Sequence, residues 1–144
     1  MATTFTNNWK NIIDKLVSLF RAEFKATMPI VIGSQEQSTN SQFMRLTPSS
    51  TSLIESHASA EIREFSIGLV YNFKDANVRK TSLDHITRMA SRVESLVQDN
   101  RTMTLTDSSF AFDCKIQSTD IEPQAEGGYI VTFDYTCLHE GNYS

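Results

Sequence analysis

Two segments near the end of the chain alternate between apolar and polar residues, and this alternation constrains the fold more than any other feature. The segments span residues 110–118 and 129–139 and are joined across a Glu-Gly-Gly sequence at 126–128. Alternation with period two is typical of strands with one buried and one hydrated face, and the two glycines favour a hairpin turn. The side chains predicted to point inward are Phe110, Phe112, Cys114, Ile116, Tyr129, Val131, Phe133, Tyr135 and Cys137.

Two other segments carry apolar residues at the helical period of 3.6, which predicts two amphipathic helices. The first covers residues 9–24 with Asn7 or Asn8 as its N-cap, and the second runs from an N-cap at Thr81 to about residue 100. Pro29 requires the first helix to end before it. The predicted buried stripes are Trp9, Ile12, Ile13, Leu16, Val17, Phe20 and Phe24 in the first helix, and Leu83, Ile86, Met89, Ala90, Val93, Leu96 and Val97 in the second.

Short apolar strands are predicted at residues 29–33 and 43–47, and a longer strand at 61–73. Residues 101–109 are predicted to be a polar connection that leaves room for a further short strand at 103–105. The longer strand places Phe65, Ile67, Leu69, Tyr71 and Phe73 on one side. A strand of this length exceeds the usual five or six residues, so it either bends at Gly68 or projects beyond the core. The polar segments 34–42 and 48–60 are predicted to be loops that order on binding a partner.

The element order is thus α-β-β-β-α-β-β within one domain, residues 1–144. One half-hydrated sheet and two amphipathic helices predict an α+β fold with two layers. The sheet is mostly antiparallel, and both helices pack on one of its faces.

The formal charge of −4 argues against a protein that binds nucleic acid by neutralising phosphates. Residues 1–80 carry nine Lys and Arg against seven Asp and Glu, whereas residues 81–144 carry four against ten. The acidic half contains the two terminal strands, where Asp113 and Asp134 can approach each other on the hydrated face. This charge is either an ordinary solvated surface or a surface that repels something negative.

Residues suited to catalysis are scattered. His57, His85 and His139 fall in three separate elements and are predicted to be surface histidines. Cys114 and Cys137 can lie opposite each other, which allows a disulfide, but buried, reduced thiols with raised pKa values are favoured. We therefore expect no catalytic, cofactor-binding or metal-binding residues, no cofactor and no enzyme activity. The first residues lack the pattern of a secretory signal, and no apolar run is long enough to span a membrane.

Several stretches resemble the small tail-terminator, or tail-completion, proteins of tailed bacteriophages, also called minor tail or neck proteins. The resemblance covers residues 9–140 and follows the order and pattern of the elements. It is carried by the opening helix, by Phe43-Met44-Arg45-Leu46-Thr47-Pro48, by Arg63-Glu64-Phe65 with Tyr71-Asn72-Phe73, by Leu83-Asp84-His85 and by Gly128-Tyr129-Ile130-Val131-Thr132-Phe133.

The resemblance implies a virion protein, assembled in the host cytoplasm, that forms a ring at the neck of the particle. Such a ring, commonly a hexamer, ends tail-tube polymerisation and contacts the tail tube protein and the head connector, while DNA passes through without sequence-specific binding. Asp113 and Asp134 would then face the lumen. Candidate partner-binding residues are Ser34, Gln35, Glu36, Gln37, Ser49, Ser50, Thr51, Ser52, Glu61 and Arg63.

Two alternatives to a terminator stay open at this point. A head-completion or adaptor protein on the connector side builds a ring of similar size. A cytoplasmic module that binds a small molecule or peptide would need a concave apolar pocket with convergent polar groups.

Overall fold

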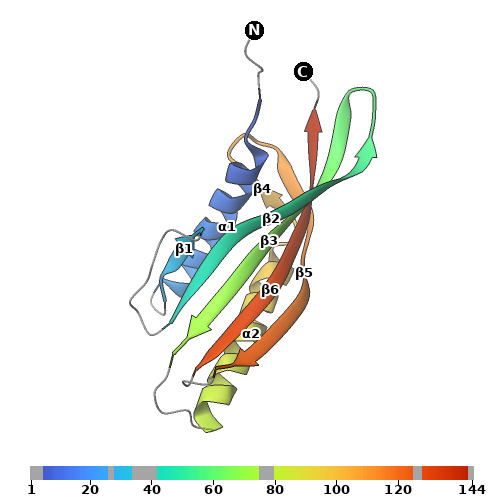
Figure 1. Ribbon diagram of the computed structural model, residues 1–144. Helices are drawn as coiled ribbons and strands as arrows, with labels where there is room; N and C mark the ends of the chain where they lie inside the picture. Colours follow the sequence, from blue (N-terminus) through green and yellow to red (C-terminus); the bar gives the residue numbers. More distant parts are fainter. Residues whose placement is uncertain (1–4, 26–27, 34–41, 75–79, 125–127, 143–144) are drawn as a thin grey trace.

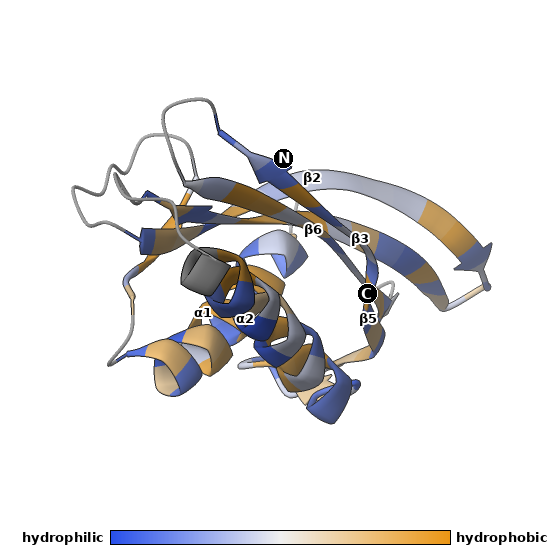
Figure 2. Cartoon of the chain, turned by 90° about the horizontal axis from the view of Figure 1, so that it is seen from below, coloured by the Kyte–Doolittle hydropathy of each residue, from blue (hydrophilic) through white to orange (hydrophobic). Residues whose placement is uncertain are grey.

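A computed structural model describes residues 5–25, 28–33, 42–74, 80–124 and 128–142. In this part of the chain, six strands form one curled sheet in the order β1-β2-β3-β6-β5-β4. Both helices lie against the same face of the sheet (Figures 1 and 2). We call this face the inner face and the opposite one the outer face. The arrangement confirms the predicted two-layer α+β fold.

The first helix, α1, spans Asn8–Phe24, and the side chain of Asn7 accepts a hydrogen bond of 3.1 Å from the backbone N–H of Lys10. This contact confirms Asn7 as the N-cap, since a cap satisfies one of the unpaired donors of the first turn. Trp9 is partly buried, and the rest of the predicted stripe is fully buried: Ile12, Ile13, Leu16, Val17, Phe20 and Phe24.

The second helix, α2, spans Lys80–Asp99, so Thr81 lies inside it and the predicted cap at Thr81 is wrong. Leu83 was expected in the core but is 50% exposed, because the first turn of α2 extends past the part of the sheet that it covers (Figure 1). Leu96 is partly buried, and the remaining apolar positions face the core: Ile86, Met89, Ala90, Val93 and Val97.

The strands are β1 (Ile30–Ile32), β2 (Gln42–Ser56), β3 (Ala60–Phe73), β4 (Met103–Thr104), β5 (Phe110–Pro123) and β6 (Tyr129–Asn142). β1 pairs with β2 in parallel, and every other pair is antiparallel. The short predicted strands and the long strand β3 are therefore confirmed. The β5–β6 pairing also confirms the terminal hairpin.

The core lies between the inner face and the two helices. The strands β3 and β6 contribute large side chains that are 1% exposed or less, because they lie at the centre of the sheet and alternate strictly. They are Ile67, Leu69 and Tyr71 from β3, and Val131, Phe133, Tyr135 and Cys137 from β6.

The prediction of a loop at residues 48–60 is wrong for residues 48–56, which belong to β2. The strand β2 continues through this segment to Ser56, and residues 50–56 pair with residues 61–66 of β3. Serine and threonine give no hydrophobic alternation here because neither face of this segment is buried. The backbone of this segment still forms a strand, because its hydrogen-bond partners lie on β3 and strand pairing does not require an alternating side-chain pattern. The other predicted loop, 34–42, lies outside the described residues except for Gln42, which begins β2.

Candidate assembly interface

The closed end of the β2–β3 hairpin extends away from the helical layer (Figures 1 and 2). We call residues 48–66 the arm. All residues of β2 from Pro48 to Ser56 are exposed, so this strand has solvent on both faces. On β3, Ala60 is buried at the start of the strand, and alternating burial begins at Phe65 and continues at every second residue to Tyr71. The arm thus confirms that one end of the long strand projects beyond the core.

The arm also has an open edge. The strand β1 pairs with β2 only at residues 44–46, so in the described part of the sheet the strand from Pro48 to Ser56 has a neighbour on one side alone. Pro48 suits such an edge because it has no N–H to donate to a further strand. Register shifts at 48/50 and 53/55 bend the strand. An exposed strand edge is a template for pairing with another chain.

The structure brings together the candidate partner residues that lie on the arm. Ser49, Ser50, Thr51 and Ser52 follow one another on β2, and the hydroxyl of Thr51 donates to the backbone carbonyl of Glu64 at 2.9 Å. Arg63 Nε lies 2.9 Å from Glu61 Oε1 on the same strand. The other four candidates, Ser34, Gln35, Glu36 and Gln37, lie outside the described residues.

Two apolar residues of the arm were missed by the analysis of the sequence. Leu53 is 49% exposed and Ile54 is 54% exposed. Their only signal is that they are adjacent aliphatic residues in a polar segment, where no alternation assigns them to a core. They are the only apolar residues of the segment 49–56, which is otherwise built from serine, threonine and glutamate.

The prediction that Phe110 and Phe112 point inward is wrong. Asp113 has a φ of 51° and lies in a register shift between Phe112 and Lys115, where β5 contains an extra residue relative to β6. This β-bulge reverses the alternation before it. Ala111 is therefore the buried residue, and Phe110 is 55% exposed. After the bulge, Cys114 points inward as predicted.

The bulge creates an apolar cluster on the outer face, which we call the outer patch: Phe110, Phe112 and Leu138. Phe112 pairs with Leu138 across β5 and β6. Leu138 lies between the buried residues Cys137 and His139, so alternation places it on the outer face. Glu140 and Glu64 flank the patch, because Glu140 is two residues from Leu138 on β6 and Glu64 pairs with Leu138 on β3.

The two aspartates predicted to approach each other are separated in register. Asp134 pairs with Ser118, whereas Asp113 lies in the bulge near Cys137. The two positions are about three residues apart along β6, or roughly 10 Å at ~3.4 Å per residue. Both aspartates are exposed, and Asp113 forms an ion pair of 3.1 Å with Lys115.

His139 is buried, contrary to its predicted place on the surface. Ser109 Oγ donates to Asp107 Oδ1 at 2.5 Å and lies 3.0 Å from His139 Nε2. Since the serine proton goes to the aspartate, His139 Nε2 donates to the serine oxygen. A hydrolase triad needs the opposite direction, with histidine taking the serine proton. The hydrogen bonds among Asp107, Ser109 and His139 therefore connect the 105–109 turn to β6. They do not activate Ser109 as a nucleophile.

The two cysteines are free and buried. The hydrogen bond between their thiols, together with burial, raises the pKa of Cys137. The same hydrogen bond lowers the pKa of Cys114, so the expectation of a raised pKa is wrong for this thiol. Cys114 is 1% exposed, which keeps it from reacting with solutes.

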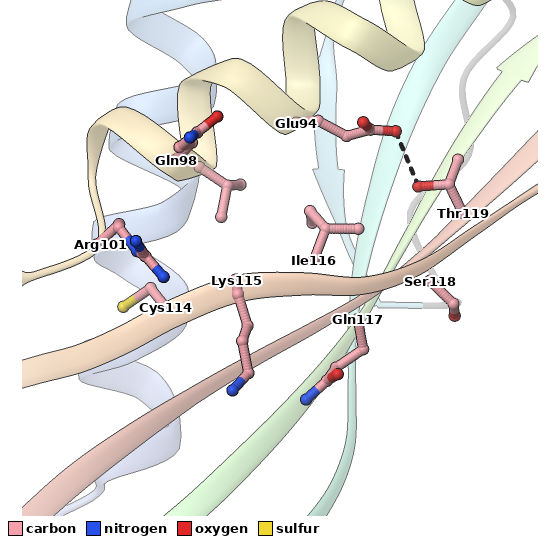
Figure 3. A pocket seen from close by; sticks show the side chains of 10 residues that line it. Glu94, Gln98, Arg101, Cys114, Lys115, Ile116, Gln117, Ser118 and Thr119 are labelled. Carbon is pink, nitrogen blue, oxygen red and sulfur yellow. Dashed lines mark hydrogen bonds between the residues drawn. The ribbon is translucent and has the colours of Figure 1, made fainter.

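A groove of about 390 Å³ lies between α2 and β5 (Figure 3). Glu94 accepts a hydrogen bond of 3.1 Å from the hydroxyl of Thr119 across it. Ile116 points toward α2, whereas Lys115 and Gln117 point away. The lining is mostly polar, unlike the apolar pocket that a small-molecule module requires. The exposed features best suited to contact another protein are therefore the arm and the outer patch.

The described residues contain no cluster of three or more His, Cys, Asp or Glu side chains that could hold a metal ion. Within the same residues, neither helix has the length and apolar character to cross a membrane.

Comparisons with known proteins give a likeness in structure. No family model and no curated protein sequence matches this chain. A chain in the solved structure of the virion of a native gene transfer agent particle superposes with a TM-score of 0.67 and 9% sequence identity. The superposition covers 95% of this chain and 100% of that chain. At this level of identity the likeness shows a shared fold, and function has to be argued from the molecular surface.

Proposed function

We propose that this chain is a structural protein of a phage-like virion, with no enzymatic role. In this proposal it forms a ring, with six copies favoured, at the head-proximal end of the tail tube. There it ends tube polymerisation and joins the tail to the head connector. The observation that carries the proposal is the fold shared with a chain of a gene transfer agent virion over essentially the whole of both chains.

The arm supports an assembling role. A strand that is exposed on both faces along Pro48–Ser56 gains little from burial within its own subunit. It provides backbone edges and apolar side chains for a neighbouring protein instead. A contact between two different surfaces of identical chains generates a ring when the rotation closes.

The charge distribution fits a ring around DNA. The balance of residues 81–144 is negative, and Asp113 and Asp134 are exposed on β5 and β6. We place these carboxylates toward the lumen, where they would repel phosphates and let DNA slide without sticking. The ring would belong to the neck of the virion and would be assembled in the host cytoplasm.

Tube assembly in vitro tests this function. The cognate tail tube protein is polymerised with and without this chain, and tube lengths are measured by negative-stain electron microscopy. A terminator stops growth and appears at one end of each tube. Tubes of unchanged length that carry no bound chain would overturn the proposal, and a chain found on tailless heads would indicate the adaptor role. The matched control is a chain with the arm shortened by deletion of residues 52–55 and 62–64, two segments that pair with each other in the hairpin and contain no buried residue.

A further inference from the structure

The outer patch presents apolar side chains that the core of the chain does not use. Phe110 is 55% exposed, and Phe112 and Leu138 are only partly buried. The bulge at Asp113, with a positive φ of 51°, turns the two aromatic residues outward at a cost in backbone strain. Exposed apolar clusters with a polar rim mark protein interaction sites, and aromatic residues are enriched at the centres of interfaces. The patch is therefore a candidate docking site.

Two carboxylates form the rim of the patch. Glu64 pairs with Leu138, and Glu140 is two residues further along β6, so alternation places both on the outer face. Neither carboxylate forms an ion pair with another residue in the described part of the chain. The guanidinium of Arg63 does not offset them, because it lies on the opposite side of β3, where it contacts Glu61 at 2.9 Å. The rim is thus negatively charged.

This negative charge decides which kind of surface can dock. The arm of another copy is unsuitable, because residues 48–66 carry three glutamates against one arginine and like charges repel. Lys115 and Asp113, next to the patch on β5, form an ion pair of 3.1 Å and together add no charge. The patch therefore requires a partner surface that is positively charged and carries an apolar side chain.

The helix α1 carries an excess of positive charge. Residues 8–25 contain four Lys and Arg against two Asp and Glu: Lys10, Lys15, Arg21 and Lys25 against Asp14 and Glu23. Both acids already have partners, since Asp14 contacts Lys10 at 2.8 Å and Glu23 contacts Arg92 at 2.7 Å. The other three cations form no ion pair with a described residue. Three positive charges on α1 are thus left for a partner.

An exposed aromatic residue stands next to these cations. Phe5 is 80% exposed and lies three residues before the start of α1 at Asn8. Lys15 is seven residues into the helix, or roughly 10 Å along its axis at ~1.5 Å per residue. The helices cover the inner face of the sheet, whereas the patch is on the outer face (Figure 2). A chain therefore cannot bring its own α1 to its own patch, but a second copy can.

We propose that α1 of one copy docks on the outer patch of the next copy. Phe5 packs against Phe110, and the cations of α1 face Glu64 and Glu140. The inference deepens the proposed ring, on which it rests, by naming the two surfaces that meet. The contact is heterologous, because the helix and the patch are different surfaces. It covers the end of the outer face nearest the arm, so Asp134, further along β6, stays free to face the lumen.

Charge reversal on each surface tests the docking. The helix variant carries Lys15→Glu and Lys25→Glu, and the rim variant carries Glu64→Lys and Glu140→Lys. Each variant alone should associate about tenfold more weakly than the wild type in sedimentation experiments, because like charges then meet. Circular dichroism checks that both variants fold, and the exposed residues Lys25 and Glu140 can be reversed alone if they do not.

An equimolar mixture of the helix and rim variants should associate like the wild type. Every contact in an alternating assembly then joins a reversed helix to a reversed rim, or an intact helix to an intact rim, so opposite charges meet throughout. A mixture that associates no better than the separate variants would overturn the proposal. Unchanged self-association of either variant would overturn it as well.

Two control variants separate this local pairing from the effect of net charge. Arg88→Glu with Arg101→Glu changes the net charge by as much as the helix variant does, at exposed residues outside α1. Asp120→Lys with Glu122→Lys does the same for the rim variant, at exposed residues of β5 far from the patch. Both controls should associate like the wild type. A loss equal to that of the matching test variant would show that net charge is the cause and would overturn the docking.

Cysteine trapping decides the matter if the free chain associates weakly. Chains with Phe5→Cys are mixed at high concentration with chains carrying Phe110→Cys and are mildly oxidised. The native cysteines are buried and should stay unreacted. Disulfide-linked heterodimers should exceed those formed by Leu83→Cys with Phe110→Cys, since Leu83 is also exposed but lies on α2. Equal yields in the two mixtures would overturn the docking.

The two proposals can fail separately. If rings form and cap tubes while the helix and rim variants assemble normally, the terminator function stands and the docking is wrong. If the mixed variants assemble but tubes grow without limit in their presence, the docking stands and the terminator function is wrong.

Discussion

Trp9 packs edge-on against Phe65, with ring centroids 4.8 Å apart and ring planes at 89°. Trp9 lies in the first turn of α1, and Phe65 lies at the position on β3 where alternating burial begins. This pair therefore fastens the start of the helix to the base of the arm. Beyond it, the arm depends on strand pairing more than on burial.

Replacement of Trp9 by alanine should lower the free energy of unfolding by about 2 kcal/mol, because the aromatic contact and part of the packing on Phe65 are lost. Urea unfolding followed by circular dichroism measures the change. The control Phe5→Ala, at a residue 80% exposed, should change stability by less than about 0.5 kcal/mol. Equal effects of the two substitutions would show that the contact does not stabilise the fold.

Stability should fall as the pH is lowered from 7.5 to 5. Burial lowers the pKa of His139 below its ordinary value of 6.5, so the unfolded chain takes up a proton in a range where the folded chain does not. The free energy of unfolding is therefore highest above pH 6.5 and decreases as the pH drops toward the folded pKa.

Urea titrations at several pH values test this dependence. The variant His139→Gln should show a flatter profile between pH 5 and 7.5. A wild-type profile in the His139 variant would exclude this histidine as the cause.

The bulge in β5 should tolerate glycine and resist a β-branched residue. At a φ of 51°, Asp113→Val should cost about 1–2 kcal/mol, whereas Asp113→Gly should cost less than about 0.5 kcal/mol because glycine adopts this conformation without strain. Unfolding in urea gives both values. The matched control is Asp134→Val on β6, an exposed strand position at which valine should be tolerated. Equal costs for valine at both positions would argue against strain in the bulge.

Gly128 should be intolerant of any side chain. It has a φ of 99°, and an added Cβ would lie 2.2 Å from the carbonyl oxygen of Phe73. Gly128→Ala should therefore cost about 2–4 kcal/mol through the clash and the backbone strain. Gly33→Ala is the matched control, with a φ of 70° and no described atom within 4 Å of the added carbon. It should cost about 1 kcal/mol, and a thermal melt that ranks the two variants in reverse would contradict the geometry.

The secondary structure of the core could be predicted from the sequence because its signals are local. The stripe of α1 and the alternation of β6 from Tyr129 to Cys137 each record which face of one element is buried. The same alternation includes residue 139, so the burial of His139 could have been inferred from its place in the series. Its partner Ser109 could not, since that contact joins distant segments.

The candidate interface was decided by tertiary structure. Whether Phe110 points inward or outward depends on the bulge at Asp113, and a bulge is a property of two paired strands that one strand does not reveal. The arm is a strand because β3 supplies its hydrogen-bond partners, whereas its serine and threonine residues carry no burial pattern. Local periodicity in the sequence thus determined the layers of this protein, while pairing between strands determined which surfaces are left for a partner.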